Sequence, residues 1–244
     1  MRPLPLALLL LLTAATAHAA PSTPLSPLQR GPEAQALRQI EATRPLPGAS
    51  FSAVKVTGRQ DLYFLSGDGR ILIKGTAYDL WSGQNLATIE DVAEATTRIN
   101  LDGFAAIWPQ LDPITLGQGP STVVAFVAPG CPHCQSLIEQ AQGLGDRYRF
   151  LLLPIPAGGQ GGAIIRALAC AADKPAATTA FLRHESLAGI AQASGCNVEA
   201  AQRRLITAQL LGVKAVPWIV RSDGTLSNGM PPDLAAWLAA GSPS

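Results

Sequence analysis

The sequence has few charged side chains and almost no net charge. Its 18 lysines and arginines are balanced by 17 aspartates and glutamates, which leaves a formal net charge of +1 over 244 residues. This balance gives no electrostatic reason to expect nucleic acid or an anionic membrane surface as a partner. Aromatic residues make up only 5% of the chain, whereas 48% of its residues are hydrophobic. We therefore expect a core of small aliphatic side chains, with alanine-rich helices.

Long apolar runs are absent beyond the N-terminus. Met1–Ala20 has the pattern of a secretory signal, with Arg2 before an apolar run at Leu6–Leu12 and the cleavage-site sequence Ala17–His18–Ala19. The run is too short to span a bilayer. We expect residues 1–19 to be removed, and the mature chain of about 225 residues to fold in an oxidising compartment as one large domain or two small ones. Retention of the segment as an N-terminal anchor is the alternative.

Metal-ligating residues are too few for a zinc site. The chain has four cysteines and three histidines, and one histidine lies in the expected signal. Structural zinc needs four ligands at matched spacing. Cys131 and Cys134 form one Cys-x-x-Cys pair, but Cys170 and Cys196 lie far apart and no second pair exists. The glycine-rich segment 157–162 also lacks the Lys–Ser/Thr ending of a phosphate-binding loop. We expect no metal and no cofactor.

The Cys-x-x-Cys pair stands where an apolar strand would pass into a helix. Val123–Ala128 is an apolar run, Pro129–Gly130 ends it, and a helical pattern covers residues 131–142. Cysteines three positions apart on a first helical turn can form a disulfide. The free N–H groups and macrodipole of a helix N-terminus favour a thiolate, and thiols so placed have pKa values of roughly 3.5–7.5. The layout predicts a dithiol–disulfide redox site.

The two residues between the cysteines suit this chemistry. Pro132 fits the first helical position, because its missing N–H would have no helical partner there. His133 would stabilise a thiolate if it were protonated or donated a hydrogen bond. A stabilised thiolate favours the reduced form, so the disulfide becomes a stronger oxidant. We expect Cys131 to be the exposed nucleophile and Cys134 the covered resolving thiol; an inert structural disulfide is the alternative.

The N-terminal part of the mature chain, residues 20–87, is expected to form a small mixed unit. The glycines around Asp68 are typical of a hairpin turn between two strands. So small a unit is expected to need a partner surface to complete its core. The patterns predict a helix over Pro32–Thr43 and strands over Ser50–Thr57, Asp61–Ser66 and Arg70–Thr76, with Ala77–Trp81 continuing the sheet.

Residues 88–120 are expected to form a linker, and residues 121–244 a second unit. Thr88 with Asp91 approximates a capping box for a helix over 89–100, and residues 112–120 are rich in glycine and proline. The order β–α–β, helical insertion, β–β–α in the second unit is that of a thioredoxin fold. Its expected strands cover 121–128, 147–153, 216–220 and 225–227, and its helices 131–142, 163–173, 175–183, 186–194, 198–211 and 232–240.

Pro217 is a second marker of the thioredoxin fold. It follows Val216 at the start of the penultimate strand, where a proline is sterically allowed. In thioredoxin-like proteins a cis-proline here faces the cysteines. The backbone groups of the preceding residue are then free to pair with an extended substrate peptide. An ordinary trans-proline at a strand edge is the alternative.

Taken together, these motifs resemble the DsbC/DsbG family of periplasmic disulfide isomerases, over nearly the whole mature chain. The resemblance implies an α/β thioredoxin-like fold with a helical insertion, preceded by a small α+β, cystatin-like dimerisation domain and a helical linker. The segments that carry it are the hairpin Leu65–Leu80, the motif Cys131–Pro132–His133–Cys134, Cys170–Lys174 with Cys196, Leu211–Val213, Val216–Pro217 and Asp223–Leu226.

Function, partners and residue roles follow from this resemblance as expectations. The family implies a V-shaped homodimer in the periplasm, misoxidised secreted proteins as clients, and a membrane reductase of the DsbD type. Val216 and Pro217 would bind substrate. Four cysteines permit three connectivities. We expect a reversible Cys131–Cys134 disulfide, with Pro132 and His133 completing the catalytic motif, and a permanent structural Cys170–Cys196 disulfide.

Two departures from the family pattern bear on which other functions stay open. The Pro132–His133 pair is the dipeptide of the oxidase DsbA, whereas the isomerases typically have Gly–Tyr or Pro–Tyr. Ala125 stands where cytosolic-type thioredoxins carry a buried acid, which argues against a general thioredoxin-like reductant. We expect isomerisation or reduction of non-native disulfides. The alternatives are a DsbA-like oxidase and a dedicated secretion or conjugation chaperone with a secondary redox site.

Overall fold

The computed structural model describes residues 32, 35, 37–46 and 50–241. The expected signal peptide lies outside these residues, as does part of the helix expected over 32–43. Among the described residues, no helix is both long enough and apolar enough to cross a membrane. The structure contains two larger sheets, which are described separately below.

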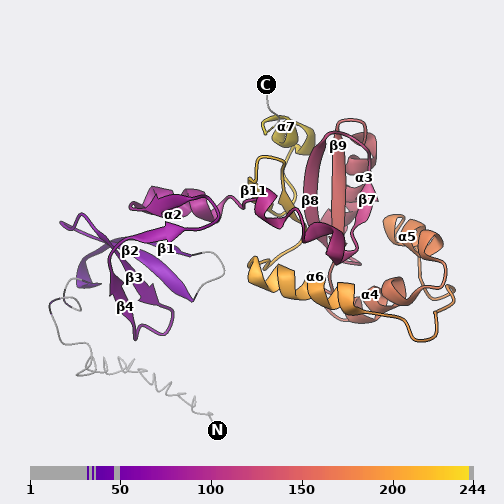
Figure 1. Ribbon diagram of the computed structural model, residues 1–244, viewed down its shortest axis with the longest axis horizontal. Helices are drawn as coiled ribbons and strands as arrows, with labels where there is room; N and C mark the ends of the chain where they lie inside the picture. Colours follow the sequence, from indigo (N-terminus) through magenta and orange to yellow (C-terminus); the bar gives the residue numbers. More distant parts are fainter. Residues whose placement is uncertain (1–31, 33–34, 36, 47–49, 242–244) are drawn as a thin grey trace, which may run out of the picture. The chain divides into compact units, whose positions relative to one another are not determined.

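Four antiparallel strands form the N-terminal sheet, in the order β1-β2-β3-β4 (Figure 1). Pro32 and Gln35, at the start of the segment predicted to be a helix, are helical. Farther along that segment, the chain instead makes a 3-10 turn at Leu37–Gln39 and then the extended strand β1. Residues that precede a proline are pushed away from helical conformations, and Pro45 ends β1. The ladder to β2 then satisfies the backbone groups of β1. The strands are β1 Ile40–Pro45, β2 Phe51–Val56, β3 Leu62–Ser66 and β4 Leu72–Lys74.

The β3–β4 turn forms where its glycines predict it. Gly69 has a φ of 70°, a left-handed conformation that glycine adopts without steric cost. The Asp68 carboxylate accepts hydrogen bonds from the Ser66 hydroxyl (2.5 Å) and the Arg70 N–H (3.1 Å), and these bonds lower the pKa of Asp68. The side chain of Asp68 therefore fixes the turn that joins the two strands.

The segment after β4 does not continue this sheet, so the prediction for residues 77–81 is wrong in that respect. β5 (Ala77–Asp79) pairs with β6 (Gln84–Leu86) in a separate two-stranded ladder. The Asp79 carboxylate accepts hydrogen bonds from the N–H groups of Trp81 and Ser82. This local bonding turns the chain back on itself directly after β5.

Helix α2 (Ile89–Thr96) covers part of the N-terminal sheet. Its capping box is formed, since the Thr88 hydroxyl accepts from the Asp91 N–H and the Asp91 carboxylate accepts from the Thr88 N–H. The helix ends four residues earlier than the sequence predicts, at a C-cap residue, Thr97. The core between α2 and the sheet consists of Ala53, Leu62, Phe64, Leu86, Ile89, Val92 and Ala95.

Five strands form the second sheet, in the order β11-β10-β8-β9-β7. The central pair, β8 and β9, is parallel, and the other pairs are antiparallel. β7 lies in the segment where the sequence predicts only a loop, so this sheet begins before residue 121. The strands are β7 Ile114–Leu116, β8 Ser121–Val127, β9 Tyr148–Pro154, β10 Trp218–Val220 and β11 Leu226–Asn228.

Glycines in the connection between β7 and β8 allow the backbone to approach the start of β9 closely. The N–H groups of Gln118 and Gly119 both donate to the Gly145 carbonyl, at 2.9 and 3.0 Å. A Cβ atom on Gly119 would lie 2.0 Å from the carbonyl carbon of Arg147. The glycines that predict a loop here are therefore required, because the connection between β7 and β8 passes close to the backbone at the start of β9.

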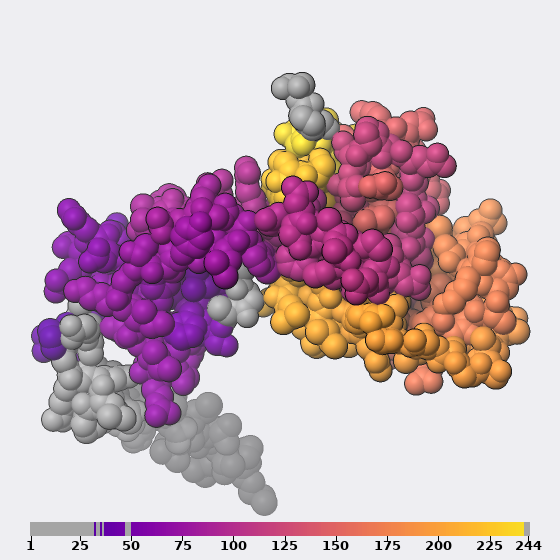
Figure 2. All heavy atoms as spheres, viewed as in Figure 1, coloured from indigo at the N-terminus to yellow at the C-terminus, as the bar shows by residue number. Residues whose placement is uncertain are grey.

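Helices cover both faces of the five-stranded sheet (Figure 1). α3 (Pro132–Gly143) and α7 (Leu234–Ala239) contribute to the core on one face. α6 (Glu199–Leu210) and the 3-10 turn Trp108–Leu111 contribute to the core on the other. A further 3-10 turn covers Asp102–Phe104. α6 lies at the surface, in yellow-orange in Figure 2.

The helical insertion between β9 and β10 contains α4 (Gly161–Cys170), α5 (Lys174–Leu182) and α6. The helix expected over 186–194 is not present; these residues form turns and one isolated bridge from Gln192 to Ala171. Backbone hydrogen bonds to the end of α4 replace helical bonds in this segment, with the Ala193 N–H donating to the Cys170 carbonyl at 2.7 Å. The order β8–α3–β9, insertion, β10–β11–α7 is that of a thioredoxin-like fold.

Candidate active site

Cys131 lies at the junction between the central strand β8 and helix α3. Residues 123–128 are buried, so this strand end is held rigidly in the core. Gly130, with a φ of 73°, turns the chain out of the sheet. Cys131 is the N-cap residue of α3, in an extended conformation, and Pro132 follows as the first helical residue. The sequence thus folds locally as its strand–Pro–Gly–Cys pattern predicts.

The two cysteines of the motif differ in their access to solvent. They form a disulfide, with their Cα atoms 5.2 Å apart. Cys134 is fully buried, whereas Cys131 is half-buried and packs at the edge of the core. The N–H of Cys134 donates to the Cys131 Sγ at 3.2 Å. A donor at this place stabilises negative charge on Cys131 when the disulfide is open.

The Val216–Pro217 segment faces this sulfur. The peptide bond between these residues is cis. The Val216 carbonyl oxygen lies 3.7 Å from the Cys131 Sγ, although the two residues are 85 positions apart in sequence. Trp218 then begins β10 and is buried against Phe126 of β8, with ring centroids 5.7 Å apart. The structure therefore brings together Cys131, Cys134, Val216 and Pro217.

The remaining motif residues lie on either side of the disulfide. His133 is exposed on the first turn of α3. Ala125, at the centre of β8, is fully buried and pairs with Ile219 of β10 and Leu152 of β9. The buried charged residues of the described chain are Arg204 and Arg221, so no acid is buried beneath these cysteines in that part of the protein.

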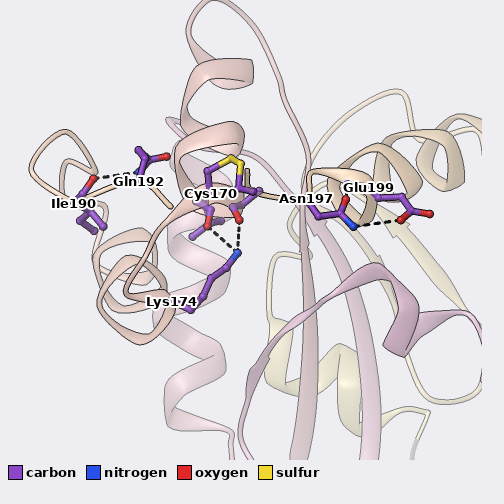
Figure 3. Close-up of a disulfide and its surroundings, with 9 residues drawn as sticks. Cys170, Lys174, Ile190, Gln192, Asn197 and Glu199 are labelled. Carbon is purple, nitrogen blue, oxygen red and sulfur yellow. Dashed lines mark hydrogen bonds between the residues drawn. A yellow bond between two sulfur atoms is a disulfide. The ribbon is translucent and has the colours of Figure 1, made fainter. Parts of the chain in front are cut away.

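The second disulfide joins Cys170, at the end of α4, to Cys196, before α6 (Figure 3). Lys174 reaches back across the end of α4 and donates to the carbonyl groups of Leu168 (3.3 Å) and Ala169. A cation at a helix C-terminus satisfies carbonyls that have no helical partner. This disulfide lies in the helical insertion, away from the reactive motif in sequence.

A hollow of about 410 Å³ opens directly beside Cys131. One wall is the start of α3 with the preceding Pro129 and Gly130. The other wall comes from the insertion, namely Ile164 of α4, Phe181 of α5 and residues 184–187. Sequence reasoning missed this hollow, because its two walls come from segments that are far apart in the chain. Within the described residues, no group of three or more His, Cys, Asp or Glu side chains could hold a metal ion.

The strand order, the cis-proline and the paired cysteines define a thioredoxin-like protein with a dithiol–disulfide site. No protein-family model matches the chain, and no curated protein matches it. Solved structures that resemble it include a disulfide interchange protein from Neisseria gonorrhoeae, at 21% identity and a TM-score of 0.45, covering 54% of this chain and 96% of that one.

Two further solved structures resemble the chain at a similar sequence identity and TM-score. ScsC from Proteus mirabilis in a compact conformation has 16% identity and a TM-score of 0.49, over 59% of this chain and 80% of that one. The thiol-disulfide exchange protein alpha-DsbA2 from Wolbachia pipientis has 15% identity and a TM-score of 0.43, over 60% and 94%. The strand order described above, rather than these likenesses, identifies the fold.

Proposed function

We propose that this protein is an exported thiol–disulfide oxidoreductase that isomerises or reduces non-native disulfides in secreted proteins. The observation that carries the proposal is the asymmetry of the cysteine pair. Cys131, at a helix N-terminus, is half-buried and lines a hollow, whereas Cys134 is fully buried. An attacking thiol must be accessible, whereas a resolving thiol must be shielded from other partners.

The reaction begins from the reduced pair. The Cys131 thiolate attacks one sulfur of a client disulfide, a new Cys131–client S–S bond forms, and the client's second sulfur leaves as a thiolate that takes up a proton. In isomerisation, another client thiolate attacks the mixed disulfide and frees Cys131. In reduction, the Cys134 thiolate attacks Cys131, so the client leaves reduced and the enzyme keeps the two-electron oxidation as its Cys131–Cys134 disulfide.

The contacts around Cys131 support this order of events. The Cys134 N–H, 3.2 Å from the Cys131 sulfur, stabilises the anion that must attack and later leave. The Val216 carbonyl, 3.7 Å from the same sulfur, is a backbone acceptor beside the reacting atoms. An extended client peptide can pair with it as an added strand, which positions the client sulfur in line with Cys131.

The wider setting is proposed together with this activity. We infer a periplasmic homodimer that receives electrons from a membrane reductase of the DsbD type, with an N-terminal, cystatin-like dimerisation domain. Support for the dimer comes from β4, an edge strand of the N-terminal sheet. Ile71 and Ile73 at this edge are 52% and 49% exposed. Ile73 pairs with the buried Phe64, so the apolar face of the sheet continues to its edge.

Trapping of mixed disulfides tests the assignment of the two sulfurs. Cys134→Ala should accumulate covalent complexes between Cys131 and scrambled ribonuclease, whose non-native disulfides Cys131 attacks, because the resolving thiol is missing. Cys131→Ala should form none. Mass spectrometry of acid-quenched mixtures measures both. The reverse pattern would overturn the assignment, and equal inertness of both variants and of the wild type would overturn the activity.

Isomerase and oxidase roles are separated by a second measurement. The reduced wild-type protein should restore activity to scrambled ribonuclease without added oxidant, since isomerisation needs no net electron transfer. An oxidase would instead need its own Cys131–Cys134 disulfide. In that form it would oxidise reduced ribonuclease, and it would leave scrambled ribonuclease unchanged. The Pro132–His133 pair makes this comparison necessary. If the protein oxidised reduced ribonuclease and left scrambled ribonuclease unchanged, oxidation would replace isomerisation as its function.

A further inference from the structure

The hollow beside Cys131 has a mixed chemical character that the redox reaction itself does not require. Its sides include the rings of Pro129, Pro132 and Phe181 and the aliphatic side chains of Ile164 and Leu187. Its volume of about 410 Å³ lies within the range of specific ligand pockets, about 300–1,000 Å³. Apolar walls of this kind bind the carbon chain of a ligand group.

One acidic residue is found among the described residues that line the hollow. It is Glu185, in the wall that comes from the insertion, and it is exposed to solvent. Gln135, His184 and Ser186 add groups that can form hydrogen bonds. Among the described residues that line the hollow there is no lysine or arginine. The lining thus combines apolar side chains with one acidic residue that is exposed to solvent.

Arginine and lysine side chains match this arrangement. Each has an aliphatic stem that packs on apolar surface and a cationic end that stays at the water boundary. An arginine guanidinium can also form charge-assisted hydrogen bonds to a carboxylate. A glutamate or aspartate side chain would meet the charge of Glu185 and is disfavoured.

The position of the hollow limits which client residue can reach it. Cys131 is itself one of its lining residues. In the mixed disulfide, the client sulfur is bonded to the Cys131 sulfur, so the residues on either side of the client cysteine must lie within a few ångströms of the hollow. We propose that the hollow binds an arginine or lysine side chain adjacent to the client cysteine that Cys131 attacks.

This proposal rests on the proposed function and adds a preference among clients. The bond changes are those of the exchange reaction: the Cys131–client S–S bond forms, the client's own S–S bond breaks, and the leaving thiolate is protonated. The basic side chain is neither oxidised nor reduced; it stabilises the complex in which the sulfurs meet.

The second disulfide anchors the wall that carries Glu185. Residues 183–198 lie between α5 and α6 and have no helix of their own. Cys196 ties the end of this segment to Cys170 of α4, and Gln192 donates to the Ile190 carbonyl at 3.1 Å beside it (Figure 3). The Ala172 N–H donates to the Ala191 carbonyl at 2.8 Å. The wall is therefore held against α4, and its place beside Cys131 is defined before a client binds.

The test uses the full chain with Cys134→Ala, in which exchange stops at the mixed disulfide. The probes are short synthetic peptides, each with one cysteine in a mixed disulfide with thionitrobenzoate and with arginine, norleucine or glutamate next to it on either side. The aromatic thiolate is the better leaving group, so Cys131 binds the peptide sulfur. Release of thionitrobenzoate gives the rate constant for each peptide.

We expect arginine peptides to react about threefold faster than norleucine peptides on at least one side of the cysteine, the size of one solvent-exposed ion pair. Glu185→Gln should bring this ratio to about one, and Glu185→Lys should favour the glutamate peptide. High salt should also lower the ratio, because it screens exposed charges. The matched control is Asp146→Asn, which removes one exposed carboxylate in the turn that follows α3 and should keep the threefold ratio.

Three results would overturn the proposal. Equal rates for all peptides, dependent on Cys131, would remove the side-chain preference and leave the oxidoreductase function standing. If Glu185→Gln does not change the preference for arginine peptides, the site that causes this preference lies elsewhere on the protein. No reaction with any peptide would remove the proposed function together with this site.

Discussion

At the scale of single residues, Arg221 joins three parts of the thioredoxin-like unit. Its Nε and Nη2 donate to the two carboxylate oxygens of Asp223, at 2.9 and 2.8 Å. Its Nη1 donates to the Trp237 carbonyl in α7 at 2.6 Å, and its guanidinium lies 5.1 Å from the centre of the Trp237 ring. Arg221 is only 9% exposed, so each of its contacts replaces water. The end of β10 is thereby fixed to the closing helix.

This ion pair makes stability depend on pH in the acid range. The hydrogen bonds from Arg221, followed by those from Thr225, lower the pKa of Asp223 from an ordinary 3.8 to about 2. A depressed carboxyl pKa stabilises the fold above the unfolded-state value, and this stability is lost as the pH falls through the folded-state value. The contribution of Asp223 should therefore be complete above about pH 4 and absent below about pH 2.

Asp223→Asn should lower the free energy of unfolding at pH 7 by about 1 kcal/mol, after allowance for solvent screening at this partly exposed carboxylate. Urea unfolding at a series of pH values measures the difference between variant and wild type, which should shrink below pH 4. Asp146→Asn, an exposed carboxylate in the turn before β9, is the matched control and should cost less than 0.5 kcal/mol, about the limit for surface substitutions. A difference for Asp223→Asn that persists unchanged to pH 2 would contradict this account.

At the scale of elements, the helical insertion depends on the Cys170–Cys196 disulfide. The disulfide spans a sequence separation of 26 residues and closes the loop that contains α5 and the helix-free segment after it. Cys170 is buried, at 4% exposed, whereas Cys196 is only half-buried. The cross-link restricts the unfolded chain more than it adds contacts to the folded one.

Cys170→Ser with Cys196→Ser should lower the free energy of unfolding of the thioredoxin-like unit by about 3.5 kcal/mol, the chain-entropy estimate for a loop of this length. Urea unfolding without reductant measures the loss. The double variant should still form mixed disulfides through Cys131, because the α3 junction does not include this cross-link. The control is wild-type protein in which the Cys131–Cys134 disulfide has been reduced and the Cys170–Cys196 disulfide is intact. Unchanged stability would show that the loop is already ordered without the bond.

At the scale of the whole molecule, assembly is the property that separates an isomerase from an oxidase. In the proposed dimer the dithiols would be shielded from a membrane oxidase, whereas in a monomer they would be open to it. The exposed apolar residues of the N-terminal sheet lie at both of its edge strands, with Ile40 at 47% on β1 and Ile73 at 49% on β4. Unpaired edges with apolar side chains favour pairing with a second chain.

Ile73→Lys should convert the proposed dimer to a monomer, because it places a charge in the apolar part of the interface. Light scattering coupled to size-exclusion chromatography measures the mass. Ile206→Lys on α6, where the isoleucine is 55% exposed, is the matched control and should leave the mass unchanged. If the wild type is itself a monomer, or if both variants stay dimeric, the proposed use of β4 is wrong.

The local elements with strong signals could be predicted from the sequence. The capping box at Thr88, the Gly–Asp–Gly turn and the β8–α3 junction all form from residues that are close together in the chain. Strand β1, strand β7 and the helix-free segment after α5 could not be predicted. In each of these, backbone hydrogen bonds to a distant partner override the local preference: Thr43 pairs with Val54, Leu116 with Phe150 and Gln192 with Ala171.

The sequence by itself determined the chemistry, because two thiols on a first helical turn have few other uses and their spacing is a local property. It also determined the class of fold through the order of its long elements. Only the tertiary structure decided what surrounds the reactive sulfur. The Val216 carbonyl lies beside the Cys131 sulfur, and Glu185 lines the same hollow as Cys131, although both come from segments more than fifty residues away in sequence. Such proximity depends on the packing of the whole unit, and no local pattern encodes it.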